Sequence, residues 1–438
     1  MPVSRKEHGF ISVRACSVTD DRLLWFILTI LTTDRSAMKK KISAVTFHYM
    51  IISGGFWMAF CVVTAYAAVF LHGAGYDDQE LGVILALGNV GGAVLSPVLG
   101  AWIDRNRKIR HAQVIYVLLA AQFLLLVLLR ANPQRNLLCA ACYVLYMTFM
   151  MPVNALNLDL CIRLEHAKAP LNFGLARSIG SFSFMVLSIL LGILTERFGY
   201  RMLPIAGIAV IALQAAGNRL TDSDLREAER GMPAIAETVQ EKASSLIDFF
   251  RENRGFCLML FGTVIIFIAH NIDGNFLINL VENLGGGPAI MGYLAAFTAL
   301  IEVPVMMFSD RLPKKWKRVQ YIRLTFVFFV LKTLAYALAP NIPVLFVSRV
   351  LQAPSYALYT ILIVGYADEV VAQKDSAKAQ SLAFSMTTIG SVLASLIGGS
   401  MFKAYGVRPA MLTASAFALT GAIIAYAATF LKKKEEIK

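Results

Sequence analysis

The chain has 438 residues, of which 57% are hydrophobic and only 16% are charged, and this composition excludes an ordinary soluble globular protein. The formal net charge is +13, but the basic residues lie in alternate loops between apolar runs and do not alternate with aromatic residues. We therefore expect no nucleic-acid partner and predict a protein that crosses the lipid bilayer many times.

Twelve apolar runs are each close to the about 20 residues that a helix needs to cross the hydrocarbon layer. They predict an all-α membrane protein with twelve transmembrane helices. The predicted spans are 43–71, 80–103, 111–130, 136–162, 172–196, 200–217, 255–281, 289–310, 319–339, 343–367, 377–403 and 408–431.

The spans form two halves, 38–217 and 254–431, on either side of a polar linker at 218–253. The last part of this linker, 241–251, has an amphipathic rhythm that favours a helix at the cytoplasmic membrane surface. A basic cytoplasmic tail, 432–438, follows the last span.

Residues 1–37 fit this pattern badly, because their apolar run Leu23–Leu31 is too short to cross a bilayer and no usual cleavage site follows it. Met38 stands directly before a lysine run and the first span. We expect 1–37 to be a disordered arm or an upstream-start extension.

Lysine and arginine also predict the orientation. The basic clusters Lys39–Lys41, Arg105–Arg110, Lys314–Arg318 and Lys432–Lys434 all fall on one side of the predicted spans, whereas the opposite loops are poor in bases. By the positive-inside rule, both termini are cytoplasmic and the protein lies in the cell membrane.

The two halves repeat each other. Gly100-x-x-x-Asp104-Arg105 has a shorter copy in Asp310-Arg311, about 206 positions later, and Ile179-Gly180-Ser181 has a copy in Ile389-Gly390-Ser391. Such a repeat predicts two pseudo-symmetric six-helix bundles that face one another, the usual arrangement for alternating access.

Six charged side chains lie inside or at the ends of the apolar runs, where a charge costs about 3 kcal/mol on insertion scales. Three acids balance three bases, which predicts neutral pairs around the polar cavity of a solute transporter. The six are Asp159, Arg177, Asp273, Glu302, Lys332 and Arg349.

The spacing of these and neighbouring residues predicts which of them line the cavity, but it leaves alternatives for Arg349 and His270. Arg349, Gln352, Tyr356 and Tyr359 share one helix face, which we expect to line the cavity unless Arg349 reaches outward to the interface. His270 serves either as a proton relay or as an ordinary satisfied polar residue.

The sequence lacks the sets of residues that a metal site or an enzyme active site requires. Cys139 and Cys142 have CxxC spacing, but no second pair or histidine group completes a zinc site. No nucleophile–base set is present either, so we expect no catalytic residue, no metal and no cofactor, and we disfavour a membrane enzyme or a receptor.

The loop Gly100-x-x-x-Asp104-Arg105-x-Arg107-Lys108 resembles the conformational motif of the major facilitator superfamily, and Asp310-Arg311 resembles its second copy. Within that superfamily, the charges resemble the branch that holds lactose, nucleoside and phenylpropionate permeases. The resemblance covers residues 38 to 434 and implies the major facilitator fold and a monomer.

The resemblance also implies site residues. Arg177, in Phe173-Gly174-Leu175-Ala176-Arg177, resembles the family's substrate-binding arginine, and Asp159 falls where its acidic partner lies. The alternative for Asp159 is a local pair with Arg163, one turn away. Phe184 stands at the position of the tryptophan that stacks on sugar.

The second half resembles lactose permease in its charges but departs from that protein's proton route. Glu302, Asp273, Lys332 and Arg349 match its charge network. Its tenth-span histidine, however, is Gln352 here, and the first of its two seventh-span acids is His270.

These residues together predict a secondary active transporter for a small polar organic solute of the sugar, nucleoside or aromatic acid class. We expect proton symport with Glu302 as the carrier, because a moving base can load and release a buried carboxyl. The alternative is a proton-coupled efflux antiporter of the same fold.

Overall fold

The computed structural model describes residues 43–106, 109–229, 245–307 and 316–431, and every regular element in these ranges is a helix. Within them, twelve helical spans are long and apolar enough to cross a membrane, which confirms the predicted number of spans. Residues 1–37, 432–438 and the Asp310-Arg311 motif lie outside the described residues.

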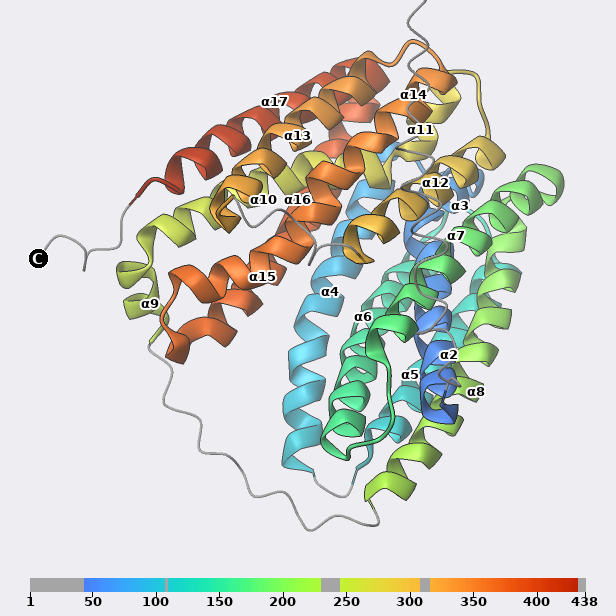
Figure 1. The fold of residues 1–438 in the computed structure, drawn as a ribbon. Coiled ribbons are helices and arrows are strands. Elements are labelled where there is room, and N and C mark those ends of the chain that lie inside the picture. The colour runs from blue at the N-terminus through green and yellow to red at the C-terminus, as the bar shows by residue number, and fades with distance from the viewer. Residues whose placement is uncertain (1–42, 107–108, 230–244, 308–315, 432–438) are drawn as a thin grey trace, which may run out of the picture. The chain divides into compact units, whose positions relative to one another are not determined.

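The first half contains the first six spans (Figure 1). Its elements are α2 (Ala44–Phe60), the π-helical turn η1 (Cys61–Ala65), α3 (Ala67–Gly73), α4 (Asp78–Arg105), α5 (His111–Ala131), α6 (Leu137–His166), α7 (Phe173–Phe198), the 3₁₀ turn η2 (Tyr200–Met202) and α8 (Leu203–Glu229). Helix α8 continues beyond the predicted end of its span at residue 217. Its polar extension is stabilised by the Arg226–Asp222 ion pair one turn apart and by Arg110, whose Nη1 lies 3.2 Å from Asp222.

The second half repeats this layout. Its elements are α9 (Leu246–Glu252), α10 (Arg254–Asn275), α11 (Leu277–Asn283), α12 (Pro288–Met307), α13 (Arg318–Leu338), α14 (Ile342–Arg349), the 3₁₀ turn η4 (Val350–Gln352), the π-helical turn η5 (Ala353–Ala357), α15 (Leu358–Val370), the 3₁₀ turn η6 (Gln373–Asp375), α16 (Ser376–Tyr405) and α17 (Val407–Ala428). The short α9 coincides with the end of the predicted amphipathic segment. Its Phe249 is buried, whereas Ile247 and Phe250 are exposed.

Backbone geometry confirms the internal repeat at several helix ends. Gly199 ends α7 with φ +78° and Gly406 ends α16 with φ +75°, a conformation that costs glycine little. Asn136 and Asn341 cap α6 and α14 with nearly identical backbone angles, and each side chain accepts the N–H three residues later. The same local signals therefore build both halves.

The halves meet through two helix pairs, α4 with α16 and α7 with α12. The contacts lie toward the end of the molecule where α4 and α12 begin, which we call the closed end. Gly82 and Gly399 allow the backbones of α4 and α16 to touch, and Gly192 and Gly292 do the same for α7 and α12. A side chain at any of these four positions would collide with the opposite half.

Polar side chains add links at the closed end. Asn279 Nδ2 lies 2.6 Å from Asp78 Oδ1, and Lys403 Nζ lies 2.9 Å from Asp77 Oδ2. Asp77 is held in place by a capping box, in which its Oδ1 accepts the Glu80 N–H at 2.9 Å. The Asn279–Asp78 and Lys403–Asp77 contacts therefore each join the first half to the second.

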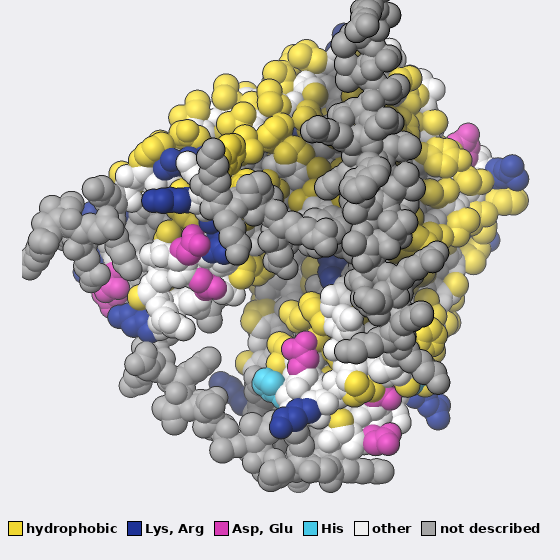
Figure 2. Space-filling view, in the orientation of Figure 1, with side chains coloured by type: hydrophobic (Ala, Val, Ile, Leu, Met, Phe, Trp, Pro, Cys, Tyr) yellow, Lys and Arg dark blue, Asp and Glu magenta, His cyan; other side chains and the backbone are white. Residues whose placement is uncertain are grey.

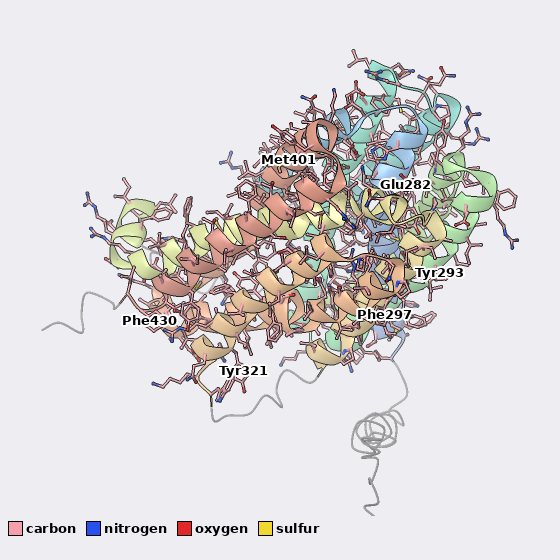
Figure 3. All side chains as sticks on the ribbon, turned by 90° about the horizontal axis from the view of Figure 1, so that it is seen from above. Glu282, Tyr293, Phe297, Tyr321, Met401 and Phe430 are labelled. Atoms are coloured by element: carbon pink, nitrogen blue, oxygen red, sulfur yellow. The ribbon has the colours of Figure 1, made fainter. Side chains whose placement is uncertain are left out.

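The opposite end, where α4 ends and α16 begins, we call the open end. Gly100, near the end of α4, has no other group within 4 Å of where a Cβ would lie, so the tight packing of Gly82 is absent there. In Figure 2 charged side chains gather at the lower part of the molecule, near the ends of α4, α6 and α15, while hydrophobic side chains cover the flank formed by α13 and α17. Figure 3 shows Tyr321 and Phe430 at the open end of the second half, far from Glu282 and Tyr293.

Candidate functional site

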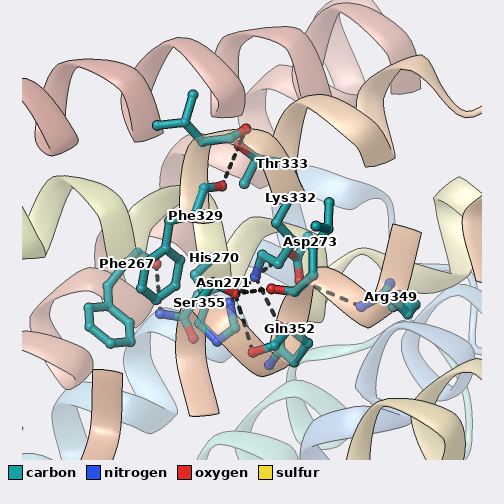
Figure 4. Close-up of polar contacts among 12 residues, drawn as sticks. Phe267, His270, Asn271, Asp273, Phe329, Lys332, Thr333, Arg349, Gln352 and Ser355 are labelled. Atoms are coloured by element: carbon teal, nitrogen blue, oxygen red, sulfur yellow. Dashed lines mark hydrogen bonds and ion pairs between the residues drawn. The ribbon is translucent and has the colours of Figure 1, made fainter. Parts of the chain in front are cut away.

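A buried charge network occupies the middle of the second half (Figure 4). Lys332, on α13, is fully buried, and its Nζ lies 3.0 Å from Asp273 Oδ2, 2.5 Å from His270 Nδ1 and 3.2 Å from Gln352 Oε1. An ammonium without water needs such a set of acceptors, because an unpaired buried charge is strongly destabilising. The structure therefore brings together four of the predicted site residues from three helices.

Arg349 is the second cation of this network. It is 4% exposed, its Nη1 lies 3.9 Å from Asp273 Oδ1, and its guanidinium lies 4.3 Å from the centroid of the Tyr336 ring. The alternative in which Arg349 reaches outward to the membrane interface is therefore wrong. Asp273 serves two cations at once.

Gln352 connects this network to Glu302. Its Oε1 accepts from Lys332, and its Nε2 donates to Glu302 Oε1 at 2.8 Å. The helix is irregular here, because Gln352 lies in the 3₁₀ turn η4 and the π-helical turn η5 follows at once. Such irregular turns within helices often mark functional sites.

The irregular turns also change the predicted face of the tenth span. Tyr359 is 1% exposed and packs against Phe267, Phe326 and Phe329 inside the second half, so it does not line a cavity with Arg349 and Gln352 as expected. The regular helical spacing assumed from the sequence does not hold through 350–357.

His270 lies between the network and an aromatic ring. Its imidazole stacks on Tyr356 with centroids 4.5 Å apart, while its Nδ1 faces Lys332. The ring is therefore satisfied on one nitrogen and packed on one face, which agrees with the ordinary polar role left open by the sequence. The proton-relay role stays a prediction.

Arg177 lies in the first half, on α7. Its guanidinium lies 4.2 Å from the centroid of the Trp57 ring, and its Nη1 donates to Ser181 Oγ at 3.2 Å. Gly180 makes room for the indole, because a Cβ there would come within 2.5 Å of Trp57 Cδ1. Trp57 lies in the first predicted span, but no charge or repeat in the sequence marks it as a site residue.

Asp159 does not pair with Arg177. Its Oδ2 lies 2.6 Å from Arg163 Nε, one turn along α6, and 3.0 Å from His111 Nε2. The local alternative is thus the one that the structure shows, and the expected neutral pair in the first half is wrong. The i,i+4 spacing forms this contact within one helix, without help from the rest of the fold.

The two halves face each other electrostatically through Arg177. Its neighbours across the interface are the Glu302 carboxyl and the neutral phenol of Tyr356, and Glu302 also interacts electrostatically with Lys332. Hydrogen bonds therefore run from Glu302 through Gln352 to Lys332, and Arg177 is an electrostatic neighbour of Glu302 with no hydrogen bond or ion pair to it among the described residues. Phe184, one helical turn beyond Gly180, is half-buried against the hydrophobic core, and its stacking role stays a prediction.

The loop motif is described only in part. Gly100 and Arg105 lie in the last turns of α4 and Arg105 is exposed, whereas Asp310 and Arg311, and the side chain of Asp104, lie outside the described residues. Within the described ranges, no cluster of three or more His, Cys, Asp or Glu residues could hold a metal ion.

The twelve helical spans, the two facing halves and the buried polar chain between them define a multi-pass membrane transporter. The MFS_1 like family matches residues 45–413, most of the chain, and the protein belongs to this family of major facilitator superfamily transporters. Its relatives are transporters and not enzymes.

Individual relatives agree with this assignment. The maltose permease of Geobacillus stearothermophilus is 23% identical over 83% of this chain and 91% of its own length. A putative sugar efflux transporter of Deinococcus radiodurans is 31% identical, but the match spans only 32% of this chain and 36% of that protein. The crystal structure of the nucleoside transporter NupG covers 89% of this chain and all of its own, with a TM-score of 0.70 at 13% identity, which shows a shared fold.

Proposed function

We propose that this protein imports a small polar organic solute of the sugar, nucleoside or aromatic acid class together with a proton. The observation that carries the proposal is the hydrogen-bonded Glu302–Gln352–Lys332 series in the second half, which has Arg177 of the first half as an electrostatic neighbour of Glu302. Relatives named for maltose and sugar support the solute class.

The contacts at the closed end support alternating access. By the positive-inside rule, the basic loops around Arg105 and Arg318 place the open end in the cytoplasm, so the described state faces inward. Separation of α4 from α16 and of α7 from α12 would open the other side. Small residues and a few polar links hold the Gly82 and Gly192 crossings.

Glu302 is the proposed proton carrier. Its carboxylate accepts from Gln352 and lies near both Arg177 and Lys332, so movement of one half relative to the other changes the cations around it. Asp273, in contrast, is held between Lys332 and Arg349 and serves the structure of the network.

Reconstituted full-length protein tests this proposal with radiolabelled maltose, uridine and 3-phenylpropionate. We expect a pH gradient, acidic outside, to drive accumulation of at least one of them, and Glu302→Gln to abolish accumulation while solute exchange at equal pH persists. Glu165→Gln, at an exposed acid, is the matched control. Undiminished accumulation by Glu302→Gln would remove Glu302 from coupling.

Efflux by proton antiport remains the second candidate, favoured by the relatives named as a putative sugar efflux transporter and, in Bacillus subtilis, Multidrug resistance protein 2. The same vesicles distinguish it, because an antiporter loses preloaded solute when the pH gradient is imposed.

A further inference from the structure

We infer that the transported solute carries one negative charge, and that its anionic group, a carboxylate, binds Arg177. The inference rests on the transport function proposed above and selects sugar acids or aromatic acids from its solute classes. It follows from which charged groups share the central polar chain.

The charged groups of the central polar chain do not balance. Arg177, Lys332 and Arg349 are cations, and Asp273 and Glu302 are the carboxylates that interact with them. Three cations against two carboxylates leave one net positive charge among the described residues. The balance expected from the sequence fails because the third acid, Asp159, is bound to Arg163 and His111 instead.

Of these three cations, Arg177 is the one without an ion pair to a carboxylate among the described residues. Lys332 and Arg349 share Asp273 inside the second half, and Lys332 also reaches Glu302 through Gln352. Arg177 has only neutral groups at close range, the Trp57 ring and the Ser181 hydroxyl. Its electrostatic interaction with Glu302 spans the gap between the halves and carries no hydrogen bond or ion pair in the described structure.

Glu165, an acid in the first half, does not compensate the charge of Arg177. Glu165 interacts with Tyr49 and accepts from Cys161 Sγ at 3.8 Å, and its side chain is exposed toward the open end. Arg177 itself is only partly buried and lies on the face of α7 that meets Trp57 and the second half. A guanidinium presents paired N–H donors that fit a carboxylate, and such charge-assisted contacts are about twice as strong as neutral ones.

The consequence is a preference that a neutral solute cannot satisfy. A carboxylate at Arg177 neutralises this group of charges, whereas a hydroxyl or amide leaves the net positive charge in place. Loading of a proton onto Glu302 adds a positive charge and strengthens the preference for an anion. Solute and proton would then enter as a neutral pair.

Thermal stability of the purified full-length protein tests the inference with two matched pairs, glucuronate against glucose and 3-phenylpropionate against 3-phenylpropionamide, each at millimolar concentration. We expect at least one acid to raise the melting temperature at a concentration at least about tenfold below that needed for its neutral match. Arg177→Gln should remove that difference, Arg177→Lys should keep part of it, and Arg163→Gln, the matched control, should leave it unchanged.

Three results would overturn the inference: equal stabilisation by both members of each pair, an acid preference that survives Arg177→Gln, or no stabilisation by either acid. Should Arg177→Gln fail to fold, the inference is decided by whether the acid stabilises the wild-type protein more than its neutral match does, and by whether Arg177→Lys reduces that difference. Flux measurements separate the two proposals. Arg177-dependent exchange of a neutral member would keep the transport function and reject the anion, whereas acid binding without any flux would reject the transport function alone.

Discussion

In the second half of the molecule, Asp273 holds Lys332 and Arg349 inside the helix bundle, with His270 and Gln352 completing the contacts. In the first half, Arg177 rests on Trp57 and hydrogen-bonds to a neutral serine. The halves are related by a repeat in sequence and in backbone, yet the second half pairs its cations with a shared carboxylate and the first half presents a single cation. This difference underlies our proposal that the second half couples the ion and the first half anchors the solute.

Asp273→Asn should have the largest effect on this comparison, because it leaves two buried cations without their shared carboxylate. We expect a loss of about 3–5 kcal/mol of folding free energy, seen as low yield of monodisperse protein and a lowered melting temperature. A second change, Arg349→Gln, should restore part of the loss. Equal stability of Asp273→Asn and wild type would show that the network is not structural.

Gly82→Ala should separate the halves at the closed end. The added methyl group collides with the backbone of Ser395, and overpacking of this kind costs about 1–3 kcal/mol. The expected result is faster labelling of a Ser188→Cys reporter, which is buried at the α7–α12 crossing, by a membrane-impermeant maleimide added outside. Gly100→Ala, where the methyl group meets nothing within 4 Å, is the control and should leave the labelling rate unchanged.

Breaking the Asp77–Lys403 ion pair by lowering the pH should have the smallest effect on the closed end. Burial opposes ionisation of Asp77, but the backbone N–H of Glu80 and the Lys403 ammonium outweigh it and lower the pKa of the carboxyl. A lowered pKa means that the link contributes fully above the ordinary aspartate value of about 4 and is lost as pH falls through the lowered value.

The same Ser188→Cys reporter checks this pH dependence, with labelling carried out during the acid exposure and normalised to the same reporter in Asp77→Asn, which lacks the link at every pH. Because Asp77 and Lys403 are both partly exposed, the acid effect on outer accessibility should be slight. An effect as large as that of Gly82→Ala would contradict this account of the closed end.

Sequence patterns were sufficient for the twelve spans, the repeat and the charge network, because apolar length and charge are strong signals in a lipid-embedded chain. These patterns were insufficient to predict which side chains contact one another. Asp159 has two candidate partners, and the sequence alone does not show that the local one, Arg163 one turn along α6, is the partner it binds. Tyr359 was misplaced because the turns η4 and η5 break the regular helical spacing that the prediction assumed.

The most direct test of the central claim, that Arg177 and Glu302 face one another across the two halves, is a double-mutant cycle on thermal stability. Melting temperatures are compared for wild type, Arg177→Gln, Glu302→Gln and the double variant, without solute. The account predicts that Glu302→Gln lowers stability more when Arg177 is present than when it is absent, with a coupling of about 0.5 kcal/mol or more. Equal shifts in the two backgrounds would contradict it.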